Sequence, residues 1–161
     1  MYDILPALFS ITISLLQTPV ADTLTQEVIA VYKQHHVGVS SVDLHCMTEV
    51  IYFEARGESY EGQIAVAEVV INRKHSSAHP NTVCNVINKD GQFTYNKQAV
   101  VDDTAAWDKA MLIAESVLLQ KHTAVVGTQV TDYHAVDVYP YWAEAYTLTN
   151  IVGNHLFYER I

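Results

Sequence analysis

Apolar residues recur every three to four positions along most of the first 122 residues, with polar residues between them. This periodicity is typical of amphipathic helices that each turn one face toward a core. We predict five helices from it, over residues 23–36, 42–55, 61–74, 82–88 and 104–122. Ser40 or Ser41 can cap the second helix at its start, and Gly57 provides a natural end for it.

After residue 129 the pattern changes, because β-branched and aromatic residues become frequent and turn-forming residues separate them. Residues 130–142 and 156–161 therefore predict short strands or irregular loops, and residues 89–98 predict a turn with a short extended piece. No repeat or linker interrupts the chain after residue 21, so we expect residues 22–161 to form one domain. The predicted class is α+β, a mainly helical body with a small β or extended part toward the C-terminus.

The first residues of the chain form a separate apolar segment. Residues 4–16 carry no charge, but they are too few to span a bilayer, which takes about 20 apolar residues. Their length suits the apolar region of a secretory signal that ends near Val20 and Ala21, although no Lys or Arg precedes them. Residues 1–21 are therefore a candidate signal or anchor, with a buried or amphipathic first helix of the domain as the alternative.

Composition and charge narrow the class of function. Half of the 161 residues are apolar and 17% are charged, which excludes a disordered chain. The net charge of -9 argues against a nucleic-acid binder, because such a protein needs a basic face for phosphates. Ten tyrosines are many for this length, and phenol rings suit a groove that binds sugars or peptides.

One carboxylate lies where the helical pattern predicts an apolar residue. Met47, Val50, Ile51 and Glu54 share one face of the helix predicted over 42–55, so Glu54 points toward the core or a cleft. Burial and the negative end of the helix dipole both raise the pKa of such a carboxyl group. Glu54 is therefore a candidate general acid, with capping of a loop or pairing to Arg56 as the structural alternative.

Two further glutamates need partners. Glu58 follows the break at Gly57, and it either approaches Glu54 or holds the turn through backbone amides and Arg56. Glu68 interrupts an apolar run, and Arg73 is the expected structural partner for it.

Five segments carry a family resemblance. They are IYFEARGESYEGQIAVAEVVINR (51–73), HPNTVCNVI (79–87), GQFTY (91–95), YHAVDVYPYW (133–142) and IVGNHLFYER (151–160). In this order they resemble the signature of the SleB-type cell wall hydrolases, a family of peptidoglycan-cleaving enzymes, over about residues 44–160. The resemblance implies a lysozyme-like α+β fold that acts on the glycan backbone of N-acetylmuramic acid and N-acetylglucosamine.

The resemblance also implies catalytic roles. The catalytic acid of the family corresponds to Glu54, and the second glutamate of the motif corresponds to Glu58, as a support or substrate-positioning group. A single effective glutamate favours a lytic transglycosylase, because a hydrolase needs a second carboxylate. A hydrolytic muramidase is the alternative, with Asp132 or Asp137 as the distant partner. No cofactor is implied.

Further motif residues are candidates for the substrate groove. They are Gln92, Phe93, Tyr95, Tyr133, His134, Asn154 and His155. Trp142 and Phe157 also match, but we expect them to pack in the core. The expected partner is peptidoglycan, and the expected state is a monomer outside the cytoplasm, in the periplasm, the envelope or the medium, or delivered as a phage lysis protein.

Histidines and cysteines leave alternatives open. Eight histidines allow a zinc amidase or endopeptidase, but no HExxH motif is present and the adjacent His35 and His36 diverge on a helix, so we expect no metal. A non-catalytic wall-binding module is the third class. Cys46 and Cys84 stand where related sequences often carry cysteines, which implies a disulfide, with two buried thiols as the alternative.

Overall fold

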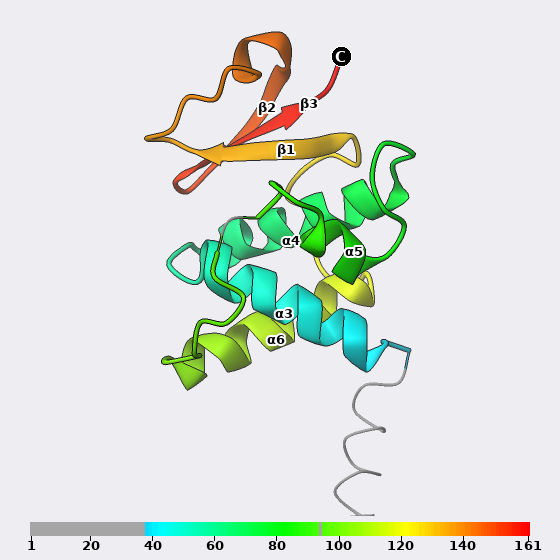
Figure 1. Cartoon of the computed structure of the whole chain (residues 1–161), viewed down its shortest axis with the longest axis vertical. Helices are drawn as coiled ribbons and strands as arrows, with labels where there is room; N and C mark the ends of the chain where they lie inside the picture. Colours follow the sequence, from blue (N-terminus) through cyan, green and yellow to red (C-terminus); the bar gives the residue numbers. More distant parts are fainter. Residues whose placement is uncertain (1–37, 94) are drawn as a thin grey trace, which may run out of the picture. The chain divides into compact units, whose positions relative to one another are not determined.

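The computed structural model describes residues 38–93 and 95–161 (Figure 1). Both the apolar segment 1–21 and the helix predicted over 23–36, with His35 and His36, lie outside the described residues. The elements are α3 (Ser41–Ala55), α4 (Tyr60–His75), α5 (Val83–Asn88), α6 (Thr104–Leu118), β1 (Val130–Ala135), the 3-10 helix η1 (Ala143–Ala145), β2 (Thr147–Val152) and β3 (His155–Glu159).

Polar side chains set the starts of the helices. The Ser40 hydroxyl accepts a hydrogen bond from the Asp43 amide, and the Ser59 hydroxyl accepts one from the Gly62 amide, at 3.4 and 3.1 Å. The Asp103 carboxylate caps α6 by accepting from the Ala106 amide at 2.9 Å. These bonds satisfy backbone donors that the first turn of a helix leaves unpaired.

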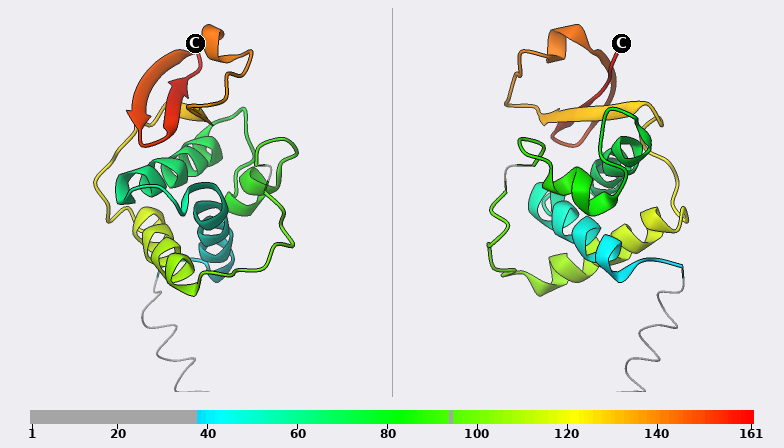
Figure 2. Two further views of the ribbon diagram at one scale, coloured as in Figure 1. Left: turned by 90° about the vertical axis from the view of Figure 1, so that its left-hand side faces the viewer. Right: turned by 45° about the vertical axis from the view of Figure 1, so that its right-hand side comes forward.

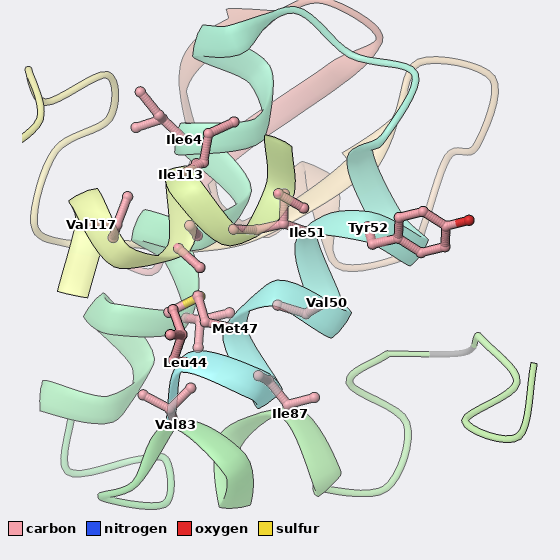
Figure 3. Packing of buried hydrophobic residues seen from close by; sticks show 14 of the residues in the cluster. Leu44, Met47, Val50, Ile51, Tyr52, Ile64, Val83, Ile87, Ile113 and Val117 are labelled. Atoms are coloured by element: carbon pink, nitrogen blue, oxygen red, sulfur yellow. The ribbon is translucent and has the colours of Figure 1, made fainter. Parts of the chain in front are cut away.

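The main core lies among the four helices. Met47, Val50 and Ile51 of α3 are fully buried, and they pack against residues of α4, α5 and α6 (Figure 3). The apolar stripe predicted on this helix therefore faces the core, and it leads to Glu54 at the end of the helix.

A small sheet lies on α4, as two views of the ribbon show (Figure 2). Its strands have the order β1-β3-β2, and both pairs are antiparallel. Val66 and Val69 of α4 are buried against Phe157 of β3. Because α4 has the sheet on one side and helices on the other, every residue from Gly62 to Val70 is buried, including the polar Gln63 and Glu68.

Three details of the fold differ from the sequence predictions. Helix α6 ends at Leu118 rather than at His122, because Gln120 has φ +55° and the Lys121 amide bonds back to the Ser116 carbonyl at 2.8 Å. Strand β2 was not predicted, whereas the described residues 89–93 and 95–98 contain the turns that were predicted there. Helix α3 ends at Ala55 as predicted, with Arg56 as its C-cap, but Gly57 is not in the left-handed region expected of a C-terminal glycine.

A disulfide joins Cys46 of α3 to Cys84 of α5, across a separation of 38 residues. The resemblance implied this pairing, and the bond links two segments of the helical core. Among residues 38–93 and 95–161, no helix is long and apolar enough to cross a membrane.

Reduction of this disulfide is expected to destabilise the protein by about 3–4 kcal/mol, because the closed loop restricts the unfolded chain. Thermal melting with and without a phosphine reductant measures the change. Thiol titration of the oxidised protein in denaturant should find no free thiol at either cysteine. Two titratable thiols, or equal melting temperatures, would contradict the prediction.

Candidate active site

A cleft with a volume of about 490 Å³ lies where the end of α3 and the side of α4 meet the sheet. Its lining comprises Glu54, Arg73, Gly91, Gln92, Asp132, Tyr133, His134, Ala135, Val138, Pro140, Trp142 and His155. A concave site of this size, with a few convergent polar groups, suits a substrate. Glu54 and Asp132 are the two carboxylates among these lining residues.

Glu54 lies in the last turn of α3 and is partly buried. Burial raises the pKa of its carboxyl group, and this effect outweighs the hydrogen bond from Tyr133 and the positive charge of Arg73, which both lower the pKa. The Tyr133 hydroxyl donates to Glu54 Oε2 at 3.4 Å. The carboxyl therefore retains its proton to a higher pH than an exposed glutamate does.

Tyr133 is positioned by β1 and by its aromatic neighbours. Its ring stacks on Phe157 at 5.5 Å between centroids and meets the edge of His155 at 5.2 Å. Burial, reinforced by the charge of Glu54, raises the pKa of the Tyr133 hydroxyl well above its usual value. The hydroxyl therefore stays protonated and acts as a fixed donor to Glu54.

Asp132 differs from Glu54 in its surroundings. The Arg160 guanidinium donates to both of its carboxylate oxygens, at 2.7 and 2.9 Å, and the Thr131 hydroxyl donates to one of them at 2.8 Å. Burial acts to raise the pKa of Asp132, but these hydrogen bonds outweigh it and lower the pKa. Asp132 is therefore an ionised carboxylate whose oxygens are already engaged.

Arg73 brings a buried positive charge to the cleft. Its Nε donates to the Thr131 carbonyl at 2.6 Å, and its guanidinium lies 5.4 Å from the centre of the Phe93 ring. Among the described residues, nothing pairs with its buried Nη1. Sequence reasoning missed this role, because it assigned Arg73 to Glu68.

The expected Glu68–Arg73 pair is wrong. Glu68 instead accepts hydrogen bonds from the amides of Val125 and Val126, and it contacts His122 at 2.9 Å. Five positions along a helix correspond to a rotation of about 140°, so the two side chains leave α4 in different directions. Glu68 thereby fixes the segment that leads from α6 to β1.

Glu58 lies outside the residues that line the cleft. It accepts hydrogen bonds from the backbone amide and the side-chain amide of Asn154, both at 3.1 Å. His155 Nδ1 is 3.8 Å from Glu58 Oε1. Glu58 therefore connects the start of α4 to the β2–β3 turn.

Arg56 was considered as an alternative partner for Glu54 and for Glu58. It instead pairs with Asp102, at 3.2 Å.

The structure brings together four of the seven groove candidates. Gln92, Tyr133, His134 and His155 line the cleft. Trp142 lines it as well, so the expectation that Trp142 packs in the core is wrong, whereas Phe157 is fully buried as expected.

The other three candidates lie elsewhere. Phe93 is only 8% exposed and packs in the helical core, so its face is not open to a sugar and the groove prediction for it is wrong. Tyr95 stacks on Phe53 at 5.0 Å, and its hydroxyl is buried. Asn154 is engaged by Glu58.

A family model described as Cell Wall Hydrolase matches residues 57–158. The chain belongs to this family of cell wall hydrolases. The match confirms the family inferred from the sequence motifs, and it includes most of the cleft lining. Among the described residues, no group of three or more His, Cys, Asp or Glu side chains could hold a metal ion.

Curated relatives and solved structures agree with the family. The chain is 40% identical over 84 residues to the spore cortex-lytic enzyme of Oceanobacillus iheyensis and 38% identical to that of Bacillus subtilis. These alignments span 44% of this chain but only 30% and 28% of those enzymes.

Two catalytic domains of cell wall hydrolases share the fold. The catalytic domain of the Bacillus cereus SleB protein has 31% identity and a TM-score of 0.62, and 76% of this chain covers 94% of it. The catalytic domain of the germination-specific lytic transglycosylase SleB from Bacillus anthracis has 29% identity, a TM-score of 0.58 and coverages of 76% and 98%. The predicted lysozyme-like α+β class is confirmed.

Proposed function

We propose that the protein cleaves the glycan strands of peptidoglycan between N-acetylmuramic acid and N-acetylglucosamine, as a lytic transglycosylase that uses Glu54 as its acid and base. The observation that carries this proposal is the partly buried Glu54 carboxyl, with a raised pKa, in a cleft whose other lining residues all lie within the matched cell wall hydrolase region 57–158. The names of the relatives support the substrate, since they are cortex-lytic and lytic transglycosylase enzymes.

The mechanism follows from the two protonation states of Glu54. The protonated carboxyl donates its proton to the glycosidic oxygen as the bond to C1 of the muramyl sugar breaks. The resulting carboxylate then accepts the proton of the muramyl C6 hydroxyl while that oxygen attacks C1. A 1,6-anhydro ring closes, Glu54 regains its proton, and no water is consumed.

Asp132 supports a second candidate, a hydrolytic muramidase. It is an ionised carboxylate that lines the same cleft as Glu54, and such a pair suits water activation. The hydrogen bonds from Arg160 and Thr131 count against this role, because they occupy the oxygens that a base or nucleophile would use.

Digestion of peptidoglycan sacculi in ¹⁸O-water, followed by mass spectrometry, distinguishes these reactions. A lytic transglycosylase yields anhydromuramyl ends that are one water lighter and carry no label. A muramidase yields reducing ends that carry one ¹⁸O atom. Complete absence of glycan cleavage would overturn both the transglycosylase and the muramidase proposals.

The Cys46–Cys84 disulfide supports a place of action outside the cytoplasm, because structural disulfides persist in oxidising compartments. The periplasm, the cell envelope and the medium all satisfy this condition, as does delivery by a phage. Peptidoglycan lies in the same compartments.

Activity is expected to fall as pH rises through the raised pKa of Glu54, since the acid works in its protonated form. The Tyr133→Phe variant should move this fall to higher pH, because it removes a hydrogen bond that lowers the pKa. The pH dependence of kcat/KM on solubilised glycan strands measures the shift. Tyr139→Phe is the matched control, since Tyr139 lies outside the cleft lining. If kcat/KM of Tyr133→Phe falls at the same pH as in the wild type, or at a lower pH, the prediction is contradicted.

A further inference from the structure

A second cavity of about 550 Å³ adjoins the cleft that contains Glu54. The two cavities share Gly91, Gln92, Asp132 and Trp142 in their linings. The two cavities therefore adjoin at these residues, and the second extends from Trp142 toward the loop that precedes β2.

Aromatic rings form much of the second cavity. Tyr141 is 94% exposed, and the Trp142 and Tyr146 rings lie 5.3 Å apart between centroids. Tyr141 supplies the exposed aromatic face of this cavity and the partly exposed Trp142 adds to it, whereas the Tyr146 ring is in contact with Trp142 and Arg160. Exposed aromatic faces on a protein indicate a binding surface. Such faces suit the apolar C–H surface of a pyranose ring, while the polar edges of the sugar remain available for hydrogen bonds.

The charges in this cavity favour a neutral occupant. Arg160 is the only cation among its lining residues, and both oxygens of Asp132 accept from it. Arg160 also lies 5.4 Å from the centre of the Tyr146 ring. The guanidinium is therefore already paired, so no free cation remains for the carboxylates of a peptide stem.

Gln92 adds an unsatisfied polar atom at the junction of the two cavities. Its Oε1 is buried, and among the described residues no donor lies within hydrogen-bond distance of it. A buried polar group without a partner costs free energy that a ligand can recover. A sugar hydroxyl or an acetamido N–H supplies such a donor.

We propose that this second cavity is a sugar subsite, in which Tyr141 and Trp142 hold an N-acetylhexosamine unit of the same strand that Glu54 cleaves. This inference rests on the proposed function and specifies where the strand continues beyond the cleavage cleft. The subsite contributes binding along the groove and takes no part in proton transfer.

Tyr141→Ala tests the subsite, because a side chain that is 94% exposed can be truncated without loss of the fold. On glycan strands we expect KM to rise on the order of tenfold with kcat and the pH profile unchanged. Tyr60→Ala is the matched control, since Tyr60 is an exposed tyrosine that lines neither cavity, and it should change nothing.

A binding measurement separates this inference from the proposed reaction. In the Glu54→Gln background, which retains the groove, calorimetry with soluble glycan strands should show the same loss of affinity on addition of Tyr141→Ala. Stem-free strands, prepared with an amidase, should show the loss as fully as strands with stems. If the loss vanishes on stem-free strands, the occupant is the peptide and the sugar subsite is wrong. Equal affinities for glycan strands with and without the Tyr141→Ala substitution would also overturn the sugar subsite. If the wild type cleaves no glycan but Tyr141→Ala still lowers the affinity for glycan strands, only the proposed function is overturned.

Discussion

Glu54→Gln is expected to reduce peptidoglycan cleavage by at least about 10²–10⁴-fold, because the amide keeps the shape of the side chain but cannot donate a proton. The rate of release of glycan fragments from sacculi measures this loss. Circular dichroism and thermal melting should show an unchanged fold. The variant should be at least as stable as the wild type at pH 7. Because the pKa of Glu54 is raised in the folded protein, the folded state becomes less stable as pH rises through that pKa and the carboxyl ionises. The uncharged amide of Gln avoids this loss.

Two nearby glutamates provide matched controls for this variant. Glu61 is exposed in the first turn of α4, so Glu61→Gln should retain full activity. Glu58→Gln should lower stability and reduce activity less than Glu54→Gln, because Glu58 bonds to Asn154 outside the cleft lining. An active Glu54→Gln together with an inactive Glu58→Gln would exchange the roles assigned to the two residues.

Gly153→Ala is expected to destabilise the protein by roughly 2–4 kcal/mol, since the strain of the left-handed conformation and the loss of hydrogen bonds to Glu58 add. Gly153 has φ +57°, a conformation that a residue with a Cβ adopts only with strain. A Cβ at this position would also lie against Glu58 Oε2 and displace it from Asn154. Urea unfolding followed by fluorescence measures the change in free energy.

Gly57→Ala is the control for this second variant. Gly57 is outside the left-handed region, and no atom lies within 4 Å of the position of a Cβ there. This substitution should therefore change the free energy of unfolding by less than about 0.5 kcal/mol. If both substitutions change the free energy of unfolding by similar amounts, the hydrogen bonds between Glu58 and Asn154 do not stabilise the β2–β3 turn.

The helices were predictable from the sequence, and β2 was not. Apolar spacing located α3, α4 and α5 within a few residues, because each helix buries at least one continuous face. Most residues of β2 are exposed, so the strand has neither an apolar run nor a clear alternation. Its position depends on backbone pairing with β3, which a local pattern does not reveal.

The candidate site was predictable in part for the same reason. Glu54 interrupts an apolar stripe that the helical period defines, so its position toward a cleft followed from local geometry. The placement of Trp142 and Phe93 depends on how loops cross the helical body, and both assignments were wrong. The assignment of Arg73 was wrong because both faces of α4 are buried, and residue type alone does not show which face holds a partner.

The contact between Tyr133 and Glu54 joins residues that are 79 positions apart, so the surroundings of Glu54 depend on the last part of the chain. The sheet residues that cover Glu54 all follow residue 129, whereas the disulfide and the helical core precede it. A chain truncated before β1 would therefore lack the sheet residues of the cleft and leave Glu54 more exposed to water. In that state we expect the carboxyl to ionise as an exposed glutamate does, because the burial that raises its pKa is reduced. The raised pKa at the end of α3 is thus a property that the C-terminal sheet helps to confer on a residue of the helical core.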